Sequence, residues 1–281
     1  MTNWVRDGEP VDTIAISDRG LLYGDGLFET IAIRRGEPRL WSYHLERLTR
    51  SCKILELAMP AELDLLKGIE VAIASSGVSS AYAVVKIMIT AGTGERGYGR
   101  GHVAAPTVLF GGFVSAPPPA EAYINGVRTI VCETQLASGS AFSGLKTLNR
   151  LEQVRARSEV IQDGAYEGLT MDTDSNIICG TMSNVFFVQD NKITTSPLVR
   201  CGVAGVMRRH VITALKAQGV HVAFGDTKLA DLDDVDEVFL SNSQFGVMPV
   251  SECDNRRWPV GELTRTVMTI LADSGIDEGR L

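Results

Sequence analysis

Cysteine is scarce in this 281-residue chain, and its five occurrences are widely scattered. They are Cys52, Cys132, Cys179, Cys201 and Cys253. Their number is odd and no CxxC pair occurs, so the sequence favours neither a disulfide framework nor a zinc site. The four histidines show no metal-ligand spacing either: His44, His102, His210 and His221. We therefore expect no bound metal and a reducing compartment, the cytoplasm.

Long apolar runs and a surplus of basic residues are also absent. No run reaches the roughly 18 residues that a membrane span needs, and the first residues, Met1–Asp7, lack the apolar core of a signal peptide. The chain carries 27 basic and 34 acidic side chains, for a net charge of −7, which argues against general nucleic-acid binding. With 44% hydrophobic residues, it has enough material for two domains with sizeable cores. The composition therefore favours an enzyme for small molecules, with no membrane or nucleic-acid partner.

Three common sequence motifs of catalysis and nucleotide binding are missing or lack the structural setting that they need. The glycines of Gly94–Gly99 form no GxGxxG fingerprint in a βαβ setting. No Gly-Lys-Ser or Gly-Lys-Thr and no GxSxG occurs. The segment Gly202–Arg208 does resemble a glycine-rich helix start, where backbone N–H groups suit a phosphate. From these residues alone, a turn that needs a flexible backbone explains the segment equally well.

One proline-rich stretch, Ser115–Ala120, divides the chain, because three prolines favour a stiff and extended connection. We predict an α+β protein with an N-terminal domain at 1–115, a linker at 116–120 and a C-terminal cofactor-binding domain at 121–281. Strands are expected at Trp4–Pro10, Val11–Ile16, Thr30–Arg34, Tyr82–Thr90, Thr107–Phe113, Val127–Cys132, Glu167–Asp172, Asn176–Cys179, Asn184–Val188 and Glu237–Ser241. A helix is expected to open at Ser42, its candidate N-cap, with Leu45, Leu48, Cys52 and Leu55 on one helical stripe. Further helices are expected to cover Ala61–Ala74, Leu148–Asp163, Gly205–Gln218 and Leu263–Ser274.

A lysine between two leucines is the most informative single residue. Lys146 follows a run of small residues, Ala137–Ala141, and precedes a helical pattern with Leu148, Leu151 and Val154 on one face. A surface lysine opening a solvated helix is the ordinary interpretation. Burial would instead lower the pKa of the amine and make it a nucleophile that forms Schiff bases.

A second basic side chain has two interpretations. Arg47 shares a helical face with Tyr43 and Arg50. A solvated charge is the default reading, but an inward-facing arginine would clamp a phosphate.

Six motifs, in order along nearly the whole chain, together resemble one family. They are Ser17–Gly20 with Tyr23–Thr30, His44–Leu48, Gly94–Tyr98, Leu145–Gln153, Ser183–Phe186 and Gly202–Arg208. The pattern resembles the fold-type IV pyridoxal-phosphate enzymes, which include branched-chain and D-amino-acid aminotransferases. The Arg96–Tyr98 and Lys146–Gln153 segments are most similar to the aminodeoxychorismate lyases within that family.

The resemblance implies a fold, a cofactor and residue roles. It implies a two-domain fold-type IV enzyme, a homodimer with pyridoxal 5'-phosphate in an active site between the domains. Lys146 would hold the cofactor and then act as acid and base. Arg47 would bind the cofactor phosphate, with the N–H groups of Val206 and Met207 and with Ser243. The residues implied on the substrate side are Phe28, Thr30, Arg96 and Asn242.

The implied activity is the conversion of 4-amino-4-deoxychorismate to 4-aminobenzoate and pyruvate, a step toward folate. A D-amino-acid or amine aminotransferase of the same fold is the alternative, as is an impaired relative.

The chain departs from the family pattern at one cofactor position. The family places a glutamate five residues before the asparagine of its Ser-Asn pair, where it holds the pyridine nitrogen protonated. Here that position is Cys179, five residues before Asn184. A thiol has a reference pKa of about 8.5 and supplies no fixed negative charge. The departure weakens the aminotransferase interpretation most, since that reaction must stabilise a carbanion.

Overall fold

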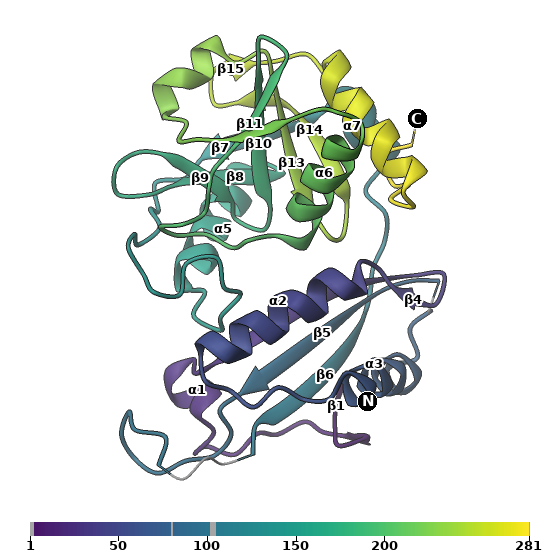
Figure 1. Ribbon diagram of the computed structural model, residues 1–281, viewed down its shortest axis with the longest axis vertical. Helices are drawn as coiled ribbons and strands as arrows, with labels where there is room; N and C mark the ends of the chain where they lie inside the picture. Colours follow the sequence, from purple (N-terminus) through teal and green to yellow (C-terminus); the bar gives the residue numbers. More distant parts are fainter. Residues whose placement is uncertain (1–2, 80, 102–104, 281) are drawn as a thin grey trace. The chain divides into compact units, whose positions relative to one another are not determined.

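The structure is a computed structural model that describes residues 3–79, 81–101 and 105–280, so His102 lies outside the described residues. The chain divides into two compact units (Figure 1). The first comprises Met1–Ala116 and Leu145–Asn149, and the second comprises Pro117–Gly144 and Arg150–Leu281. The chain therefore returns to the first unit for a short segment that contains Lys146, a return that the sequence did not indicate. Among the described residues, every helix is too short or too polar to span a lipid bilayer.

The first unit is built on a six-stranded sheet of order β2-β1-β6-β5-β3-β4, with every neighbouring pair antiparallel. Its strands are β1 (Trp4–Arg6), β2 (Glu9–Pro10), β3 (Gly26–Arg34), β4 (Glu37–Pro38), β5 (Tyr82–Thr90) and β6 (Thr107–Val114). The sequence placed β5 at these same bounds, because its side chains alternate between buried and half-exposed positions. The predicted strand at Val11–Ile16 is wrong: apart from one backbone bond from Val11 to Trp4, this segment pairs with no strand.

Two helices, α2 (Trp41–Ile54) and α3 (Glu62–Ser76), cover one face of this sheet. Figure 1 shows α2 running alongside the strands. Leu48 and Cys52 of α2 join one apolar core with the buried side chains of β3 and β5, as the helical stripe predicted. The expected cap at Ser42 is wrong, because α2 begins one residue earlier and Leu40 takes the cap position in a left-handed conformation.

A short helix precedes β3 where the sequence indicated only a loop. The helix α1 (Arg19–Tyr23) begins at Asp18, whose carboxylate accepts a hydrogen bond from Gly20 N at 2.8 Å. It ends at Gly24, which has a φ of 64°. The left-handed turn at Gly24 ends α1, and β3 begins two residues later at Gly26.

The second unit contains a nine-stranded sheet of order β12-β11-β10-β13-β14-β7-β8-β9, with β15 paired to β14. Its strands are β7 (Val127–Val131), β8 (Glu167–Met171), β9 (Ile177–Gly180), β10 (Asn184–Gln189), β11 (Lys192–Thr195), β12 (Val222–Phe224), β13 (Glu237–Asn242), β14 (Gly246–Cys253) and β15 (Arg256–Arg257). Residues 181–183 join β9 directly to β10, and Gly180 N donates to Ser183 O at 2.8 Å. Since β9 ends the strand order while β10 lies near its other end, the sheet curls toward a barrel.

Helices alternate with these strands along the sequence of the second unit. They are α4 (Ala120–Asn125), α5 (Leu151–Asp163), α6 (Val206–Ala217), α7 (Glu262–Asp273) and the 3-10 helix η1 (Leu229–Asp234). The expected apolar face of α5 is wrong: Leu151 and Val154 are 85% and 62% exposed, and Ala156 and Val160 are the buried residues. Leu148 is not helical: it lies at a bend in the segment whose backbone pairs with the start of β3.

Candidate active site

The Lys146 segment lies alongside the first half of β3. Thr147 forms an antiparallel bridge with Leu27, and Phe28 N donates to Lys146 O at 2.9 Å. Leu148 N donates to Gly26 O at 3.0 Å. Directly opposite residues of an antiparallel pair project to the same face, so Lys146 shares its face with Phe28. The Lys146 Nζ lies 4.2 Å from the centroid of the Phe28 ring. Lys146 is therefore a half-buried amine on a fixed strand-like segment, not an exposed residue that opens a helix.

Two glycines leave room for this segment. A Cβ on Gly26 would lie 2.4 Å from Ile89 O and 2.8 Å from Leu148 Cδ1. A Cβ on Gly24 would lie 2.5 Å from Oδ1 of Asn149, whose Nδ2 donates to Gly24 O at 3.1 Å. The Tyr23–Phe28 motif is thus the surface that receives the lysine segment, which gives its glycines a physical reason.

Phe28 and Thr30, which the resemblance implied on the substrate side, project from β3 to the same face as Lys146. Their partners on β5 are Met88 and Lys86 respectively. Lys86 Nζ lies 4.8 Å from the Phe28 ring centroid, so two lysines approach one phenyl ring. Lys86 was not predicted from the sequence, where its only signal is its place in the alternating pattern of β5.

Arg47 is buried, as the inward-facing interpretation predicted, and it pairs with Glu29 of β3. Its Nε donates to Glu29 Oε1 at 2.8 Å and its Nη2 donates to Oε2 at 2.5 Å. His44 Nδ1 lies 2.7 Å from Glu29 Oε2. A carboxylate only accepts, so this histidine nitrogen carries the proton and donates it. Among the described residues, His44 Nε2 is buried without a hydrogen-bond partner.

The charges of this cluster follow from its burial. Burial alone would raise the pKa of Glu29, but the Arg47 charge and the His44 contact outweigh it and lower that pKa to about 2. Burial lowers the pKa of His44 more than Glu29 raises it, so the imidazole is neutral at neutral pH. Glu29 is therefore ionised and holds Arg47 in one orientation.

Arg96, a third implied substrate residue, is exposed on the loop between β5 and β6. The backbone of this loop is held by Arg19, whose Nη1 donates to Gly97 O at 3.0 Å and whose Nη2 donates to Tyr98 O at 2.8 Å. The described residues supply no ion-pair partner for Arg96. The loop backbone is therefore anchored while its arginine side chain projects outward.

Asp25 connects this loop to the Tyr23–Phe28 segment, which receives the Lys146 segment. It accepts from Arg19 Nε at 2.9 Å and from Arg100 Nη2 at 2.6 Å. Burial would raise the pKa of Asp25, but hydrogen bonds from the two arginines lower it below its usual value. The carboxylate thus stays ionised between two guanidinium groups.

Cys179 of β9 is buried in the second unit, in a small apolar cluster with Ile178 and Cys201. Thr170 Oγ1 lies 2.9 Å from Cys179 O and 3.5 Å from Cys179 Sγ. The threonine hydroxyl has one hydrogen and donates it to the carbonyl, so it accepts from the thiol. Burial raises the pKa of the Cys179 thiol to about 11. The side chain is therefore a neutral thiol at neutral pH.

A buried carboxylate nearby holds the turn that follows β9. Glu167 Oε2 accepts from Met182 N at 3.1 Å and from Ser183 Oγ at 2.9 Å. Its Oε1 accepts from the backbone N and the hydroxyl of Thr181. Because both oxygens are used in this way, Glu167 is a structural residue of the turn and no substitute for a carboxylate at 179. This role of Glu167 was not predicted from the sequence.

The start of α6 leaves its first-turn backbone N–H groups without a side-chain cap, which is what a bound phosphate would need. Its cap residue is Gly205, which supplies no side-chain hydrogen bond to the first turn of Val206 and Met207. A Cβ on Gly205 would lie 2.0 Å from Asn184 Oδ1, and Asn184 Nδ2 donates to Val203 O at 2.9 Å. Asn184, of the Ser-Asn pair, thus sets the backbone path into this helix.

Asn242 and Ser243 lie where β13 turns into β14. Asn242 Oδ1 accepts from the backbone N of Gln244 at 2.8 Å and of Phe245 at 3.0 Å. Its amide thus shapes the turn, and Ser243 sits inside that turn. Asn242 therefore stabilises this turn, in addition to the substrate contact that the resemblance implied.

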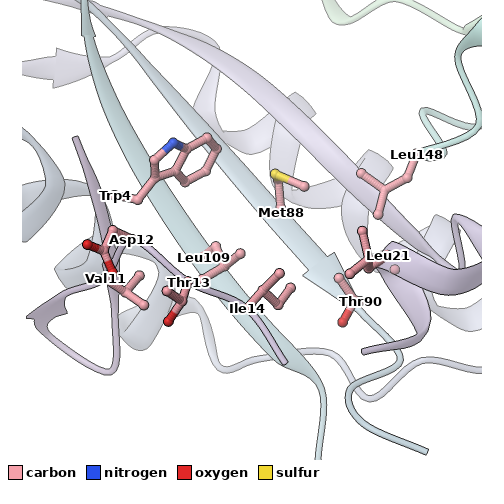
Figure 2. Close-up of a pocket in the computed structure, with 11 residues that line it drawn as sticks. Trp4, Val11, Asp12, Thr13, Ile14, Leu21, Met88, Thr90, Leu109 and Leu148 are labelled. Atoms are coloured by element: carbon pink, nitrogen blue, oxygen red, sulfur yellow. The ribbon is translucent and has the colours of Figure 1, made fainter. Parts of the chain in front are cut away.

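An apolar pocket of about 410 Å³ opens on the first unit (Figure 2). Its lining includes Trp4, Met88 and Leu148, and also Thr13 and Ile14 of the segment that precedes α1. None of the residues implied for cofactor or substrate lines it. Met88 lies opposite Phe28 in the sheet register, so this pocket borders the face of the sheet on which Lys146 lies.

The described structure thus gathers Lys146, Phe28 and Thr30 on one face of the first unit. Arg47 of α2 pairs with Glu29 of β3, and Arg96 also belongs to the first unit. The second unit holds the other implied residues: Cys179, Val206, Met207, Asn242 and Ser243. Among the described residues, no group of three or more His, Cys, Asp or Glu side chains could hold a metal ion.

Residues 26–253 match the family model described as amino-transferase class IV. The chain is 37% identical over 267 residues to an aminodeoxychorismate lyase from Vibrio harveyi, covering 93% of this chain and 96% of the relative. The crystal structure of 4-amino-4-deoxychorismate lyase from Pseudomonas aeruginosa matches with a TM-score of 0.88 and 41% identity, over 97% of this chain and 99% of that one. A hypothetical aminotransferase from Mycobacterium tuberculosis in its PLP-bound form matches with a TM-score of 0.79 and 25% identity, over 98% and 96%.

Proposed function

Because the chain belongs to the amino-transferase class IV family, we propose that it is a pyridoxal-phosphate-dependent lyase. It converts 4-amino-4-deoxychorismate to 4-aminobenzoate and pyruvate. The similarity to two lyases over nearly the whole chain supports this choice of reaction. The observation that carries it is the half-buried amine of Lys146, held by backbone hydrogen bonds beside Phe28.

The residues present fit the cofactor at three places. Lys146 supplies the amine that would hold its aldehyde. Gly205 leaves the first-turn N–H groups of Val206 and Met207 without a side-chain cap, which suits a phosphate. Arg47, kept in one orientation by Glu29, and Ser243 would complete the phosphate contacts. When bound, the cofactor supplies an aldehyde for the amine and a ring that withdraws electrons from the adjacent atoms.

Lys146 performs the proton transfer in this proposal. Its Nζ takes the proton from ring carbon 4 of the substrate, the carbon that bears the amino group. The bond between the neighbouring ring carbon and the enolpyruvyl oxygen then breaks, and the leaving group takes up a proton to become pyruvate. The ring becomes aromatic, which drives the step forward.

The neutral Cys179 thiol favours this lyase reaction over transamination. Its position lacks the fixed negative charge that would keep a pyridine nitrogen protonated. An elimination that makes an aromatic ring relies less on the cofactor as an electron acceptor than transamination does. The substitution is therefore better tolerated in a lyase.

The direct test is incubation of the cofactor-loaded protein with 4-amino-4-deoxychorismate. We expect 4-aminobenzoate and pyruvate in equal amounts, and neither product from the Lys146→Ala variant. The exposed Lys67 on α3 supplies a matched control, since Lys67→Ala should keep full activity. Absence of 4-aminobenzoate from the unaltered protein would refute the proposal.

Borohydride reduction and peptide mapping test the position of the cofactor independently of turnover. The label should lie on Lys146, in the peptide that contains Leu145 and Thr147. A label on another lysine, or none in cofactor-saturated protein, would contradict the assignment.

An aminotransferase for D-amino acids or amines is the second candidate, favoured by the match to the PLP-bound aminotransferase from Mycobacterium tuberculosis. D-Alanine and 2-oxoglutarate would then yield pyruvate and glutamate together. An impaired relative would give neither reaction and would bind the cofactor poorly.

We also propose that the enzyme is a cytoplasmic homodimer. All five cysteines are free and buried, which suits a reducing compartment. The assembly state is the family expectation, and its test is given in the Discussion.

A further inference from the structure

Arg208 is a buried cation in the first turn of α6. Its side chain is 9% exposed, and it belongs to the third residue of the helix, after Val206 and Met207. Its Nε donates to Thr195 Oγ1 at 3.3 Å, and its Nη2 donates to Ser196 O at 2.7 Å. Both acceptors are uncharged. The guanidinium group therefore has polar contacts that fix its orientation, but these contacts do not balance its charge.

No carboxylate balances this charge within the described part of the chain. The first turn of α6 contains no acidic side chain, and Arg208 forms no ion pair with any described residue. The Phe224 ring centroid lies 5.3 Å from Arg208 Cζ and offers only a weak cation–π attraction. Burial lowers the pKa of Arg208 to about 10, and no neighbouring charge opposes that effect. A cation buried in this way is costly unless an anion compensates it.

The position of Arg208 in the helix adds to this cost. The amino-terminal end of an α-helix carries a partial positive charge, so it repels a cation and attracts an anion. The cap residue, Gly205, leaves the first-turn N–H groups without a side-chain acceptor. The start of α6 thus combines uncapped N–H groups with a buried cation and holds no negative group. An anion bound there would compensate both.

We infer that Arg208 supplies the positive charge that makes the start of α6 select a phosphate group. This inference rests on the proposed function, in which the N–H groups of Val206 and Met207 contact the phosphate of pyridoxal 5'-phosphate. A phosphate group is mostly doubly charged at neutral pH. A partly desolvated guanidinium acts on that charge with little screening by salt. Arg208 is thus a positioning residue that acts through its charge, while the backbone of the turn contacts the anion.

The test uses the cofactor-free protein and two ligands that differ by one phosphate, pyridoxal 5'-phosphate and pyridoxal. Arg208→Gln removes the charge and keeps an amide donor, whereas Arg208→Lys keeps the charge. Arg208→Gln should weaken binding of pyridoxal 5'-phosphate about 3- to 30-fold, as expected for a charge at a helix end. Binding of pyridoxal should not change, and Arg208→Lys should restore most of the loss. Arg209→Gln is the matched control, since it removes the same charge from the next, exposed residue and should change neither affinity.

Inorganic phosphate gives a second measurement that needs no cofactor. At constant ionic strength, added phosphate should raise the melting temperature of the cofactor-free protein, because it binds the folded state. The increase should be smaller in Arg208→Gln and unchanged in Arg209→Gln. In the cofactor-loaded protein, added phosphate should give no further increase, because the phosphate of the cofactor already occupies the start of α6.

Three results would overturn the inference. The first is an equal loss of affinity for both ligands in Arg208→Gln, which would give Arg208 only a structural role. The second is an equal loss in Arg209→Gln, which would assign the effect to surface charge in general. The third is stabilisation of the cofactor-loaded protein by free phosphate through Arg208, which would place a separate anion site there.

Two further points keep the test decisive. Should Arg208→Gln fail to fold, Arg208→Lys carries it alone. A preference for pyridoxal 5'-phosphate over pyridoxal close to that of the unaltered protein supports the role of the charge, and loss of this preference contradicts it. A borohydride label away from Lys146, or absence of 4-aminobenzoate, would refute the proposed function. The melting experiment with inorganic phosphate would still decide whether Arg208 strengthens anion binding at α6.

Discussion

At position 179 the protein holds a buried, neutral thiol. The hydroxyl of Thr170 donates to the Cys179 carbonyl and accepts from the thiol, so both groups are satisfied without charge. A glutamate here would bury a carboxylate beside apolar side chains, at a cost of several kcal/mol unless a partner compensates it. The cofactor's pyridinium is the partner that the proposed function would supply.

Cys179→Glu should therefore raise any side transaminase activity and shift the cofactor absorption toward the form with a protonated ring. It should also lower the melting temperature of the cofactor-free protein, with recovery when the cofactor binds. Spectra, a D-alanine and 2-oxoglutarate assay, and melting curves with and without cofactor measure these effects. Cys201→Ser, in the same apolar cluster, is the control and should leave the spectrum unchanged. Unchanged activity and spectrum in Cys179→Glu would show that Cys179 does not face the ring nitrogen.

Glu29 is the residue that makes a buried Arg47 possible. Arg47 donates two hydrogen bonds to Glu29 in the core of the first unit, and His44 donates a third to the same carboxylate. Removing one member of a buried ion pair leaves the other uncompensated, which typically costs about 3–5 kcal/mol.

Acid should destabilise the protein through Glu29. Its pKa falls from 4.5 to about 2 on folding, so its contribution is fully present above pH 4.5 and is lost as the pH falls toward 2. A shift of this size corresponds to about 3 kcal/mol. Urea unfolding at pH 7 and at pH 3 should show Glu29→Gln to be less stable at pH 7 and to lose less stability at pH 3 than the unaltered protein. An equal acid loss in both proteins would assign the effect to other carboxylates.

At the scale of elements, the position of the segment at 145–149 depends on the absence of a side chain at Gly26 of β3. Gly26 is close to both Ile89 O and Leu148, so any side chain there would push the lysine segment away from β3. The hydrogen bond from Phe28 N to Lys146 O would lengthen with it.

Gly26→Ala should consequently reduce cofactor occupancy and cost about 1–3 kcal/mol of stability, as overpacking of a closed site does. Gly99→Ala is the control, because a Cβ at Gly99 meets nothing within 4 Å. Cofactor absorbance per chain and thermal unfolding measure both effects. Full cofactor occupancy in Gly26→Ala would show that the segment adapts without loss.

Elements with a clear period could be predicted from the sequence, and elements made by distant pairing could not. Strand β5 alternates, and the Leu48 and Cys52 stripe of α2 repeats at helical spacing, so both were predicted. The Thr147 bridge to Leu27 joins residues far apart in the chain and leaves no periodic trace. A helix was therefore expected to run through Leu148, where the chain instead pairs with the start of β3.

The candidate site divides in the same way. Lys146, Arg47 and Cys179 were identified by resemblance to a family, and their burial is now visible. Glu29 was quoted only within a motif, and Lys86 only within a strand pattern. The roles of these two charges depend on neighbours from other strands and helices, and the sequence alone does not show which residues those are.

For the whole molecule, the proposed homodimer predicts a doubled mass in solution. The first unit exposes a group of large apolar side chains at and before α1: Ile16, Leu21 and Leu22. Leu21 is 58% exposed and also borders the apolar pocket shown in Figure 2. Clustered apolar side chains on a surface are typical of protein contacts. We therefore expect this group to lie in the contact between the two copies.

Leu21→Asp should convert the dimer to a monomer, because a charge in an apolar contact has no partner and must be desolvated. Leu63→Asp, at a position of α3 that is 79% exposed, should leave the dimer intact. Light scattering after size exclusion gives the mass of each variant, and melting curves show whether each still folds. A monomeric unaltered protein would contradict the dimer. A folded dimeric Leu21→Asp would instead place the contact elsewhere on the surface.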